Sequence, residues 1–349
     1  MKKIVCVDLF CGIGGLTHGL VTEGIKVVAG YDVDESCRYA FEVNNNARFI
    51  KKSVAEIKKK EIEELFQGAS IRVLVGCAPC QPFSIQTLKK NKDDKRWGLL
   101  NDFLRVIEFS EPDLISMENV PNLSKQDIYL NFESSLKRMG YYVSASKVFS
   151  PEYGMPQKRK RLVLLASKLG GISIIEPTHT NENYKNVEKT IGHLKPLTAG
   201  ETYPLDPLHS CNPLTELNLK RIRASKEGGT WEDWDDELKL PCHKRLRTKM
   251  FMGVYGRMNR KEPAPTLTTY CLKVNSGRFA HYSQDRGLSV REASLIQTFP
   301  EYYKFYNPKY PRPSNVILSR QIGNAVPVEL GRVIAKSIKK HLTNNGVKI

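Results

Sequence analysis

The chain opens with a strand, a glycine turn and a helix, and this unit restricts the possible folds more than any other feature. An apolar, β-branched run at residues 4–10 precedes three glycines at 11–15, and a helical pattern follows at 16–23. A strand at 26–32 and a helix at 34–44 repeat the arrangement. Repeated βα units predict a parallel sheet covered by helices.

The alternation continues to about residue 166 and then stops. It predicts helices near 55–66, 100–109 and 130–139 and strands near 71–75, 113–117, 141–149 and 161–166. From about residue 177 periodicity weakens while Pro, Asn, His and Thr become frequent, so we place a domain boundary there. Helical patterns return at 289–298 and at 329–341.

The composition is that of a globular protein with a strong basic excess. A formal charge of +17 over 349 residues indicates a polyanionic partner or a lysine bias in the host. No apolar run reaches about 18 residues, and the first residues lack a signal-peptide pattern, so we expect a cytoplasmic protein with no membrane span. The eight scattered cysteines do not predict a disulfide framework.

The glycine turn is suited to close approach of a ligand. Backbone N–H groups at a helix N-terminus would face that ligand, and Asp32, at the end of the second strand, suits a pair of ribose hydroxyls. Thr17 stands where the dinucleotide fingerprint has its third glycine. The pattern therefore favours a nucleoside ligand without a pyrophosphate, and a purely structural turn is the alternative.

Residues 71–84 hold a second turn of chemical interest, with Cys77-Ala78-Pro79-Cys80 directly after an apolar strand. A redox pair or half of a zinc site would fit Cys-x-x-Cys. No second such pair completes a zinc set, so we predict no metal site, and the prolines favour an extended chain over a redox helix. A nucleophilic Cys80 fits best, with Cys77 as a buried neighbour, although a structural thiol is the default for either residue.

Charged groups surround this turn in the predicted sheet. Glu118 ends a strand that should neighbour the cysteine's strand, and Gln157-x-Arg159-x-Arg161 should place both arginines on one face. A solvated carboxylate and a charged edge strand are the bland alternatives. Residues 85–96 carry five cations against two anions and suit phosphates, although most such runs are solvated loops.

Six motifs in order carry a family resemblance. They are Asp8-Leu9-Phe10-Cys11-Gly12-Ile13-Gly14-Gly15, Pro79-Cys80-Gln81-Pro82-Phe83-Ser84, Glu118-Asn119-Val120, Gln157-x-Arg159-x-Arg161, Arg291-Glu292-Ala293 with Gln297-x-Phe299-Pro300, and Gln321-x-Gly323-Asn324. Together they closely resemble the DNA (cytosine-5)-methyltransferase family of bacterial restriction-modification type, from about residue 4 to about residue 330. Each motif alone is weak, but their order and spacing are specific.

The resemblance implies an α/β fold with two domains. The larger would be the S-adenosylmethionine-dependent methyltransferase domain, a Rossmann-like mixed sheet flanked by helices, at 1–176 and 320–349. A smaller, irregular, strand-rich target-recognition domain would cover 177–287, and 288–319 would form a hinge region. The last helix would return to the first.

The resemblance also implies a reaction and its residues. The enzyme would transfer a methyl group from S-adenosylmethionine to carbon 5 of a specific cytosine, flipped out of duplex DNA. Cys80 would attack carbon 6 and Glu118 would bond ring nitrogen 3 and the amine. Arg161 would hold the carbonyl oxygen with support from Arg159.

Further residues follow from the same motifs. For the cofactor they are Phe10, Gly12, Gly14, Asp32, Val33, Ser53, Leu99 and Asn324. Ser53 stands where the family commonly has an acid on the adenine amine. For DNA we expect Gln81, Ser84, Lys89, Lys90 and Arg96 beside the nucleophile. In the variable region we expect base contacts among Arg257, Asn259, Arg260, Thr268, Thr269, Tyr270, Asn275 and Arg278.

The implied partners are duplex DNA and a cognate restriction endonuclease, and we expect a monomer near the bacterial nucleoid. One alternative is a transfer-RNA methyltransferase of the same family, whose usual Cys-Phe-Thr signature is absent. Another is a DNA-binding relative that has lost catalysis, which the presence of Cys80 and Glu118 disfavours. A nicotinamide-dependent oxidoreductase is the third.

Overall fold

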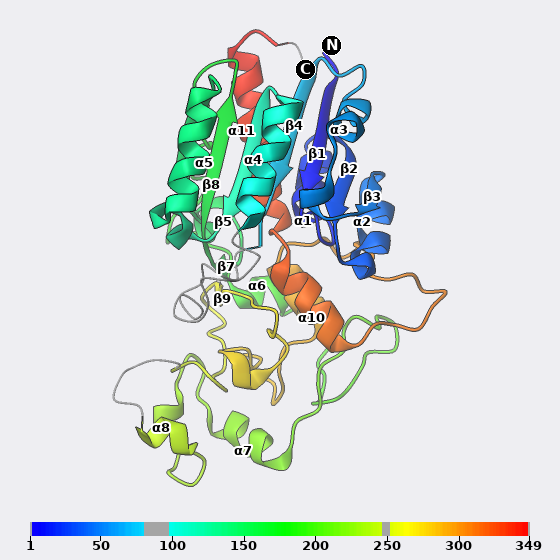
Figure 1. Ribbon diagram of the computed structural model, residues 1–349. Helices are drawn as coiled ribbons and strands as arrows, with labels where there is room; N and C mark the ends of the chain where they lie inside the picture. The colour runs from blue at the N-terminus through cyan, green and yellow to red at the C-terminus, as the bar shows by residue number, and fades with distance from the viewer. Residues whose placement is uncertain (1, 80–97, 246–251, 348–349) are drawn as a thin grey trace. The chain divides into compact units, whose positions relative to one another are not determined.

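A computed structural model describes residues 2–79, 98–245 and 252–347 of the protein (Figure 1). The chain divides into two compact units. Unit 1 comprises Met1–Tyr153, Lys160–Thr178 and Ala325–Ile349, and unit 2 comprises Gly154–Arg159 and His179–Asn324. Residues 288–319, predicted as a hinge region, belong to unit 2 by this division.

Unit 1 is built on a seven-stranded sheet with the order β3-β2-β1-β4-β5-β8-β6. The strands are β1 (Ile4–Leu9), β2 (Lys26–Asp32), β3 (Arg48–Lys51), β4 (Ile71–Gly76), β5 (Leu114–Asn119), β6 (Tyr142–Phe149) and β8 (Lys160–Ser167). The first five pair in parallel, and β8 is antiparallel to both of its neighbours. The parallel pairing predicted from the βα repeats is confirmed for these five strands, and the mixed sheet is confirmed for the unit as a whole. The connection from β6 to β8 is too short for a parallel crossover, which requires a dozen or more residues.

Helices cover both faces of this sheet, with α4 and α5 in front of it and α11 behind it in Figure 1. The helices of unit 1 are α1 (Gly15–Thr22), α2 (Arg38–Asn45), α3 (Lys59–Leu65), α4 (Leu99–Ser110), α5 (Asp127–Arg138) and α11 (Val328–Asn344). Short 3-10 helices lie at Glu35–Cys37, Val54–Glu56, Pro121–Lys125 and Ser150–Tyr153. The predicted elements lie within a few residues of the observed ones. Among the described strands of this unit, β3 was not anticipated.

The last helix packs against the first through two glycines, as the resemblance implies. A Cβ atom on Gly19 of α1 would lie 2.4 Å from the carbonyl oxygen of Val328, and one on Gly331 of α11 would lie 2.7 Å from that of Leu16. Backbones at this distance exclude any side chain between them. The final helix is therefore an integral layer of the sheet domain.

Unit 2 is irregular and contains little regular strand. Its helices are α6 (Val187–Ile191), α7 (Glu216–Ala224), α8 (Pro241–Arg245), α9 (Val290–Ile296) and α10 (Asn315–Asn324), with 3-10 helices at Trp231–Asp233 and Val274–Ser276. Among its described residues only β7 (Gln157–Lys158) and β9 (Ala264–Pro265) pair as strands, beside isolated bridges. The strand-rich prediction is therefore wrong for this part of the chain. Frequent Pro and Gly residues limit long ladders here.

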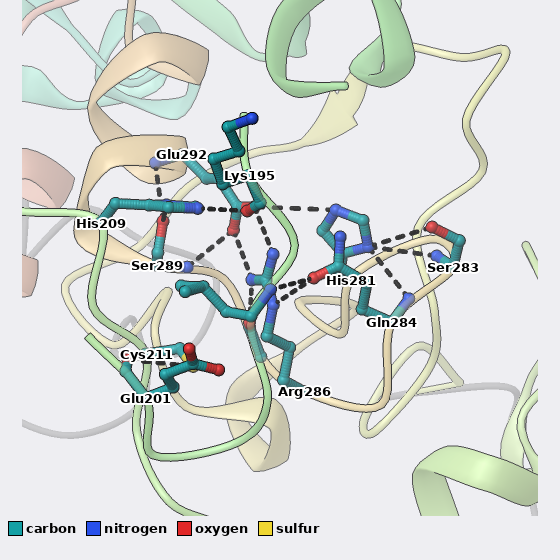
Figure 2. Close-up of polar contacts among 12 residues, drawn as sticks. Lys195, Glu201, His209, Cys211, His281, Ser283, Gln284, Arg286, Ser289 and Glu292 are labelled. Atoms are coloured by element: carbon teal, nitrogen blue, oxygen red, sulfur yellow. Dashed lines mark hydrogen bonds and ion pairs between the residues drawn. The ribbon is translucent and has the colours of Figure 1, made fainter. Parts of the chain in front are cut away.

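A buried polar cluster holds unit 2 together in place of a sheet (Figure 2). Arg286 donates to both carboxylate oxygens of Glu292 at 2.8 and 2.7 Å, and both side chains are fully buried. Ser289 caps α9 and its hydroxyl lies 2.9 Å from His209 Nδ1. Burial raises the pKa of Glu292, but the bonds from Arg286 outweigh it and hold that pKa below its usual value.

Candidate active site

The carboxyl ends of β4 and β5 bring the first group of predicted residues together. The two strands are parallel neighbours, with Gly76 opposite Met117, so the prediction that the strand of Glu118 neighbours that of the cysteines is confirmed. Glu118 is 2% exposed. Ligands of open α/β sheets bind at this edge, which makes a buried carboxylate there a strong candidate.

Two side chains contact the Glu118 carboxylate, one at each oxygen. The thiol of Cys77 donates to Oε2 at 2.7 Å, and the Nε atom of Arg161 lies 2.9 Å from Oε1. Arg161 also donates to the carbonyl oxygen of Lys160 at 2.8 Å. Cys77 was predicted to be a buried neighbour that closes the strand, but it is partly exposed and bonds the carboxylate directly.

Asn119 fixes the segment that leads toward the predicted nucleophile. This buried side chain donates from Nδ2 to the carbonyl oxygen of Ala78 at 3.0 Å and accepts from the backbone N–H of Val120 at 2.8 Å. Cys80 follows Ala78 by two residues and lies outside the described residues, as do Gln81, Ser84, Lys89, Lys90 and Arg96.

Arg159 and Gln157 are placed differently from Arg161. The N–H of Arg159 donates to the carbonyl oxygen of Gln157 at 2.8 Å, a tight turn that interrupts the predicted alternation. The Arg159 side chain is buried in unit 2 and its Nη1 lies 3.4 Å from the carbonyl oxygen of Leu267. Gln157 is also buried and bonds Gln297.

The glycine turn holds its neighbours in unusual conformations. Phe10, Gly12 and Gly14 all have positive φ angles, of 61°, 51° and 85°. A non-glycine residue in this region is uncommon, and such strain concentrates at functional sites. Within the turn the N–H groups of Cys11, Gly12 and Gly14 donate to Tyr31, Asp32 and Cys11, so these donors already hold the turn in shape.

Asp32 faces this turn from the end of β2. Its Oδ2 accepts from the N–H of Gly12 at 2.9 Å, and its Oδ1 accepts from the N–H of Asp34 at 2.9 Å. Burial raises its pKa against the opposing effect of these bonds. The carboxylate is thus fixed at the place where the sequence predicts a ribose contact, with lone pairs left to accept from hydroxyls.

A second carboxylate lies beneath the turn and was not anticipated. Asp8 is buried, and the hydroxyl of Thr17 donates to its Oδ2 at 2.6 Å. Its Oδ1 has no hydrogen-bond partner among the described residues, and burial raises the pKa to about 7. Thr17 replaces a fingerprint glycine because its hydroxyl bonds this acid.

The remaining cofactor candidates are dispersed around unit 1, with one exception. Val33 is 65% exposed beside Asp32, and Ser53 and Leu99 are half-buried at the starts of a 3-10 helix and of α4. Asn324 is exposed at the end of α10, which belongs to unit 2.

Several predicted base-reading residues instead support the fold of unit 2. Arg257 is 8% exposed and donates to the carbonyl oxygens of Ser225, His281 and Gln284 and to the carboxylate of Asp285.

Two further arginines are similarly engaged. Arg278 is half-buried and donates to the carbonyl oxygen of Gly229, and Arg260 pairs with Glu227 at 2.9 Å. Arg257 and Arg278 thus donate within the fold of unit 2, and base contact by either residue stays a prediction.

Thr268 lies on a different part of unit 2, in a segment held by α10. The Ser319 hydroxyl donates to the carbonyl oxygen of Thr269 at 2.9 Å. A Cβ atom on Gly323 would lie 2.3 Å from the carbonyl oxygen of Thr268. The side chains of Thr268 and Tyr270 are exposed on this clamped backbone. The helix α10, which was not predicted from the sequence, thus supports the segment that carries Thr268 and Tyr270, two of the predicted base contacts.

The mixed sheet, the glycine turn after β1 and the acid at the end of β2 define an S-adenosylmethionine-dependent methyltransferase fold. The model of the C-5 cytosine-specific DNA methylase family matches residues 4–340, and the chain belongs to that family. The predicted activity, DNA (cytosine-5)-methyltransferase, is confirmed by this membership.

Individual relatives agree with this result. The Type II methylase M.HgiDII of Herpetosiphon aurantiacus is 50% identical over 339 residues, which are 96% of this chain and 95% of that protein. The Type II methyltransferase M1.HphI of Haemophilus parahaemolyticus is 29% identical, over 98% of this chain and 88% of its own. A solved structure of a prophage-encoded DNA modification methyltransferase candidate from E. coli has a TM-score of 0.74 at 20% identity, covering 97% and 99% of the two chains, and so shares the fold.

In the part of the chain that the structure describes, no helix combines the length and apolarity needed to cross a bilayer.

Proposed function

We propose that the enzyme methylates cytosine in duplex DNA by covalent attack of Cys80 on carbon 6 of a flipped base. The observation that carries this proposal is the buried Glu118 carboxylate, fixed at the end of β5 beside the strand that leads to Cys80. The carboxyl group in this position would share a proton with ring nitrogen 3 and accept a hydrogen bond from the exocyclic amine. These bonds stabilise the electron-rich ring that forms when the thiolate adds.

Cys80 forms the bond to carbon 6 and leaves it again by elimination after a base removes the proton from carbon 5. Arg161 would hold the carbonyl oxygen of the base, and its contact with Glu118 places the two groups side by side. Arg159, which donates to the carbonyl oxygen of Leu267 in unit 2, is the proposed support of Arg161, as the family resemblance implies.

S-adenosylmethionine, when bound, would supply the methyl group from its sulfonium sulfur. The residues of the glycine turn fit its nucleoside and amino acid parts. The positive φ angles of Phe10, Gly12 and Gly14 allow a ligand to approach the backbone closely, and Asp32 has lone pairs that can accept from ribose hydroxyls. The exposed apolar side chain of Val33 suits one face of the adenine. Ser53, Leu99 and Asn324 complete the proposed set.

The net charge of the chain and its similarity to Type II methylases support binding to DNA. A net charge of +17 suits a polyanion, and Lys89, Lys90 and Arg96 with Gln81 and Ser84 would lie nearest the flipped base. Residues 177–287 would recognise the target sequence, with Arg260 and Thr268 as contacts. Residues 1–176 and 320–349 would carry out catalysis, and residues 288–319 would form a hinge.

Since the relatives named above are Type II methylases, we infer a restriction-modification role with a cognate endonuclease. We expect a monomer that works in the bacterial cytoplasm, at the nucleoid.

Labelling with tritiated S-adenosylmethionine tests the reaction. Wild-type protein should label carbon 5 of cytosine in mixed-sequence duplex DNA and leave transfer RNA unlabelled, whereas Cys80→Ala should bind DNA without labelling it. The matched control is Cys211→Ala, which removes a buried thiol from unit 2 and should retain full activity. Equal labelling by wild type and Cys80→Ala would show that the protein binds DNA without catalysis of its own.

A further inference from the structure

The Cys77 thiol is the contact of Glu118 whose role the proposed mechanism leaves open. It reaches Oε2 at 2.7 Å, while Arg161 lies against Oε1. A thiol is a weak donor, and at this distance its bond restricts the rotation of the carboxyl group. We propose that Cys77 is a positioning residue for methyl transfer, which holds the Glu118 carboxylate in the orientation that receives the base.

Both ends of this contact are rigidly supported. The N–H of Cys77 donates to the carbonyl oxygen of Leu9 at 3.3 Å, and a Cβ atom on Gly76 would lie 2.9 Å from the same oxygen. The end of β4 is therefore packed against β1 without space for adjustment. Glu118 lies in a strand paired on both sides, opposite Val163 of β8. Two fixed backbones thus deliver the thiol and the carboxylate to each other.

The two contacts on Glu118 have different consequences for catalysis. Arg161 is needed by the carbonyl oxygen of the base in the proposed function, on which this inference rests. When Arg161 turns to the base, Cys77 still restrains the carboxylate through Oε2. Without the thiol, the carboxylate is free to rotate into its ion pair with Arg161 and away from the base. The thiol therefore affects the chemical step more than the binding of DNA or cofactor.

Cys77→Ala and Cys77→Ser test this role in single-turnover methylation. We expect Cys77→Ala to lower the rate constant about tenfold, the effect of one lost hydrogen bond, and to change the KM values for DNA and S-adenosylmethionine less than about twofold. Cys77→Ser replaces the thiol with another donor and should recover most of the rate. Cys211→Ala removes a thiol that donates to the carbonyl oxygen of Thr198 in unit 2, and it should match wild type.

A double-mutant cycle with Glu118→Gln distinguishes positioning from general support of the fold. If Cys77 acts through the carboxylate, Cys77→Ala should slow the Glu118→Gln enzyme less than about twofold. An equal slowing in both backgrounds, an unchanged rate in the Cys77→Ala single variant, or a Cys77→Ser enzyme no faster than Cys77→Ala would overturn the inference. Should Cys77→Ala fold poorly by thermal unfolding, the Cys77→Ser rate alone decides. Failure of the proposed function looks different, because wild type itself would then leave cytosine unlabelled.

Discussion

At the scale of single residues, the candidate site contains three carboxylates whose surroundings differ. Glu118 is held between a thiol and a guanidinium, Asp32 accepts two backbone N–H groups, and Asp8 is buried with one hydroxyl donor. Motif positions identified Glu118 and Asp32. They gave no sign of the bond between Asp8 and Thr17, because a hydroxyl nine residues away gives no periodic signal.

Asp8 should make stability depend on pH. Burial raises its folded pKa to about 7, well above the ordinary pKa of an aspartate, so the fold favours the neutral carboxyl. That contribution is complete below about pH 4 and is lost as pH rises through about 7. Asp8→Asn should remove roughly 4 kcal/mol of this dependence, measured by urea unfolding from about pH 4 to about pH 8. Parallel stability curves for the two proteins would contradict it.

Asp32 should contribute to cofactor affinity. Asp32→Ala removes a fixed acceptor beside the glycine turn, and we expect binding of S-adenosylmethionine to weaken about 10- to 100-fold by calorimetry. Asp236→Ala removes an exposed carboxylate from unit 2 and serves as control. Unaltered binding by Asp32→Ala would place the ribose elsewhere.

At the scale of elements, each unit is fixed by one buried contact. The helix α11 closes on α1 through glycines, and α9 is fixed by the buried pair of Arg286 and Glu292. The sequence located α9 well because its capping pattern, Ser289 with Glu292, is local. It missed α10 and β3, which depend on tertiary contacts more than on periodicity.

Gly19→Ala should destabilise unit 1 by about 1–3 kcal/mol, because the added methyl group meets the backbone of α11. Chemical denaturation would measure the loss. Gly171→Ala is the matched control, since its Cβ has open space around it, and it should leave stability nearly unchanged. A similar loss in both variants would contradict the packing explanation, because backbone entropy alone makes Gly→Ala stabilising.

Glu292→Ala should destabilise unit 2 by about 3–5 kcal/mol, because it leaves the fully buried Arg286 charge without its carboxylate. Thermal unfolding with and without DNA would measure this loss. Glu232→Ala, at an exposed site near a 3-10 helix, should have little effect. A stable Glu292→Ala protein would mean that Arg286 finds other acceptors.

At the scale of the whole molecule, charge is the dominant property. Net charge predicts partners but not their sequence, and the arginines expected to read bases show the difference. Arg257 is engaged with backbone carbonyls in the interior of unit 2. Composition could not separate such an arginine from one that faces DNA.

Binding to duplex DNA of unrelated sequence should depend steeply on salt. With six or more phosphate contacts, affinity should fall at least about 10³-fold between about 50 and about 200 mM salt, measured by fluorescence anisotropy. The affinity for S-adenosylmethionine provides the internal control and should change far less. A flat salt dependence for DNA would contradict a phosphate-based interface.

The sequence by itself determined the βα order and the family and supplied the candidate site residues, because periodicity and motif spacing are local properties of the chain. Tertiary structure decided the place of β8 between β5 and β6, the contact of Cys77 with Glu118 41 residues away, and the structural use of Arg257. These outcomes depend on which distant groups meet. A hydrogen bond between such groups forms only when the packed sheet brings their strands together.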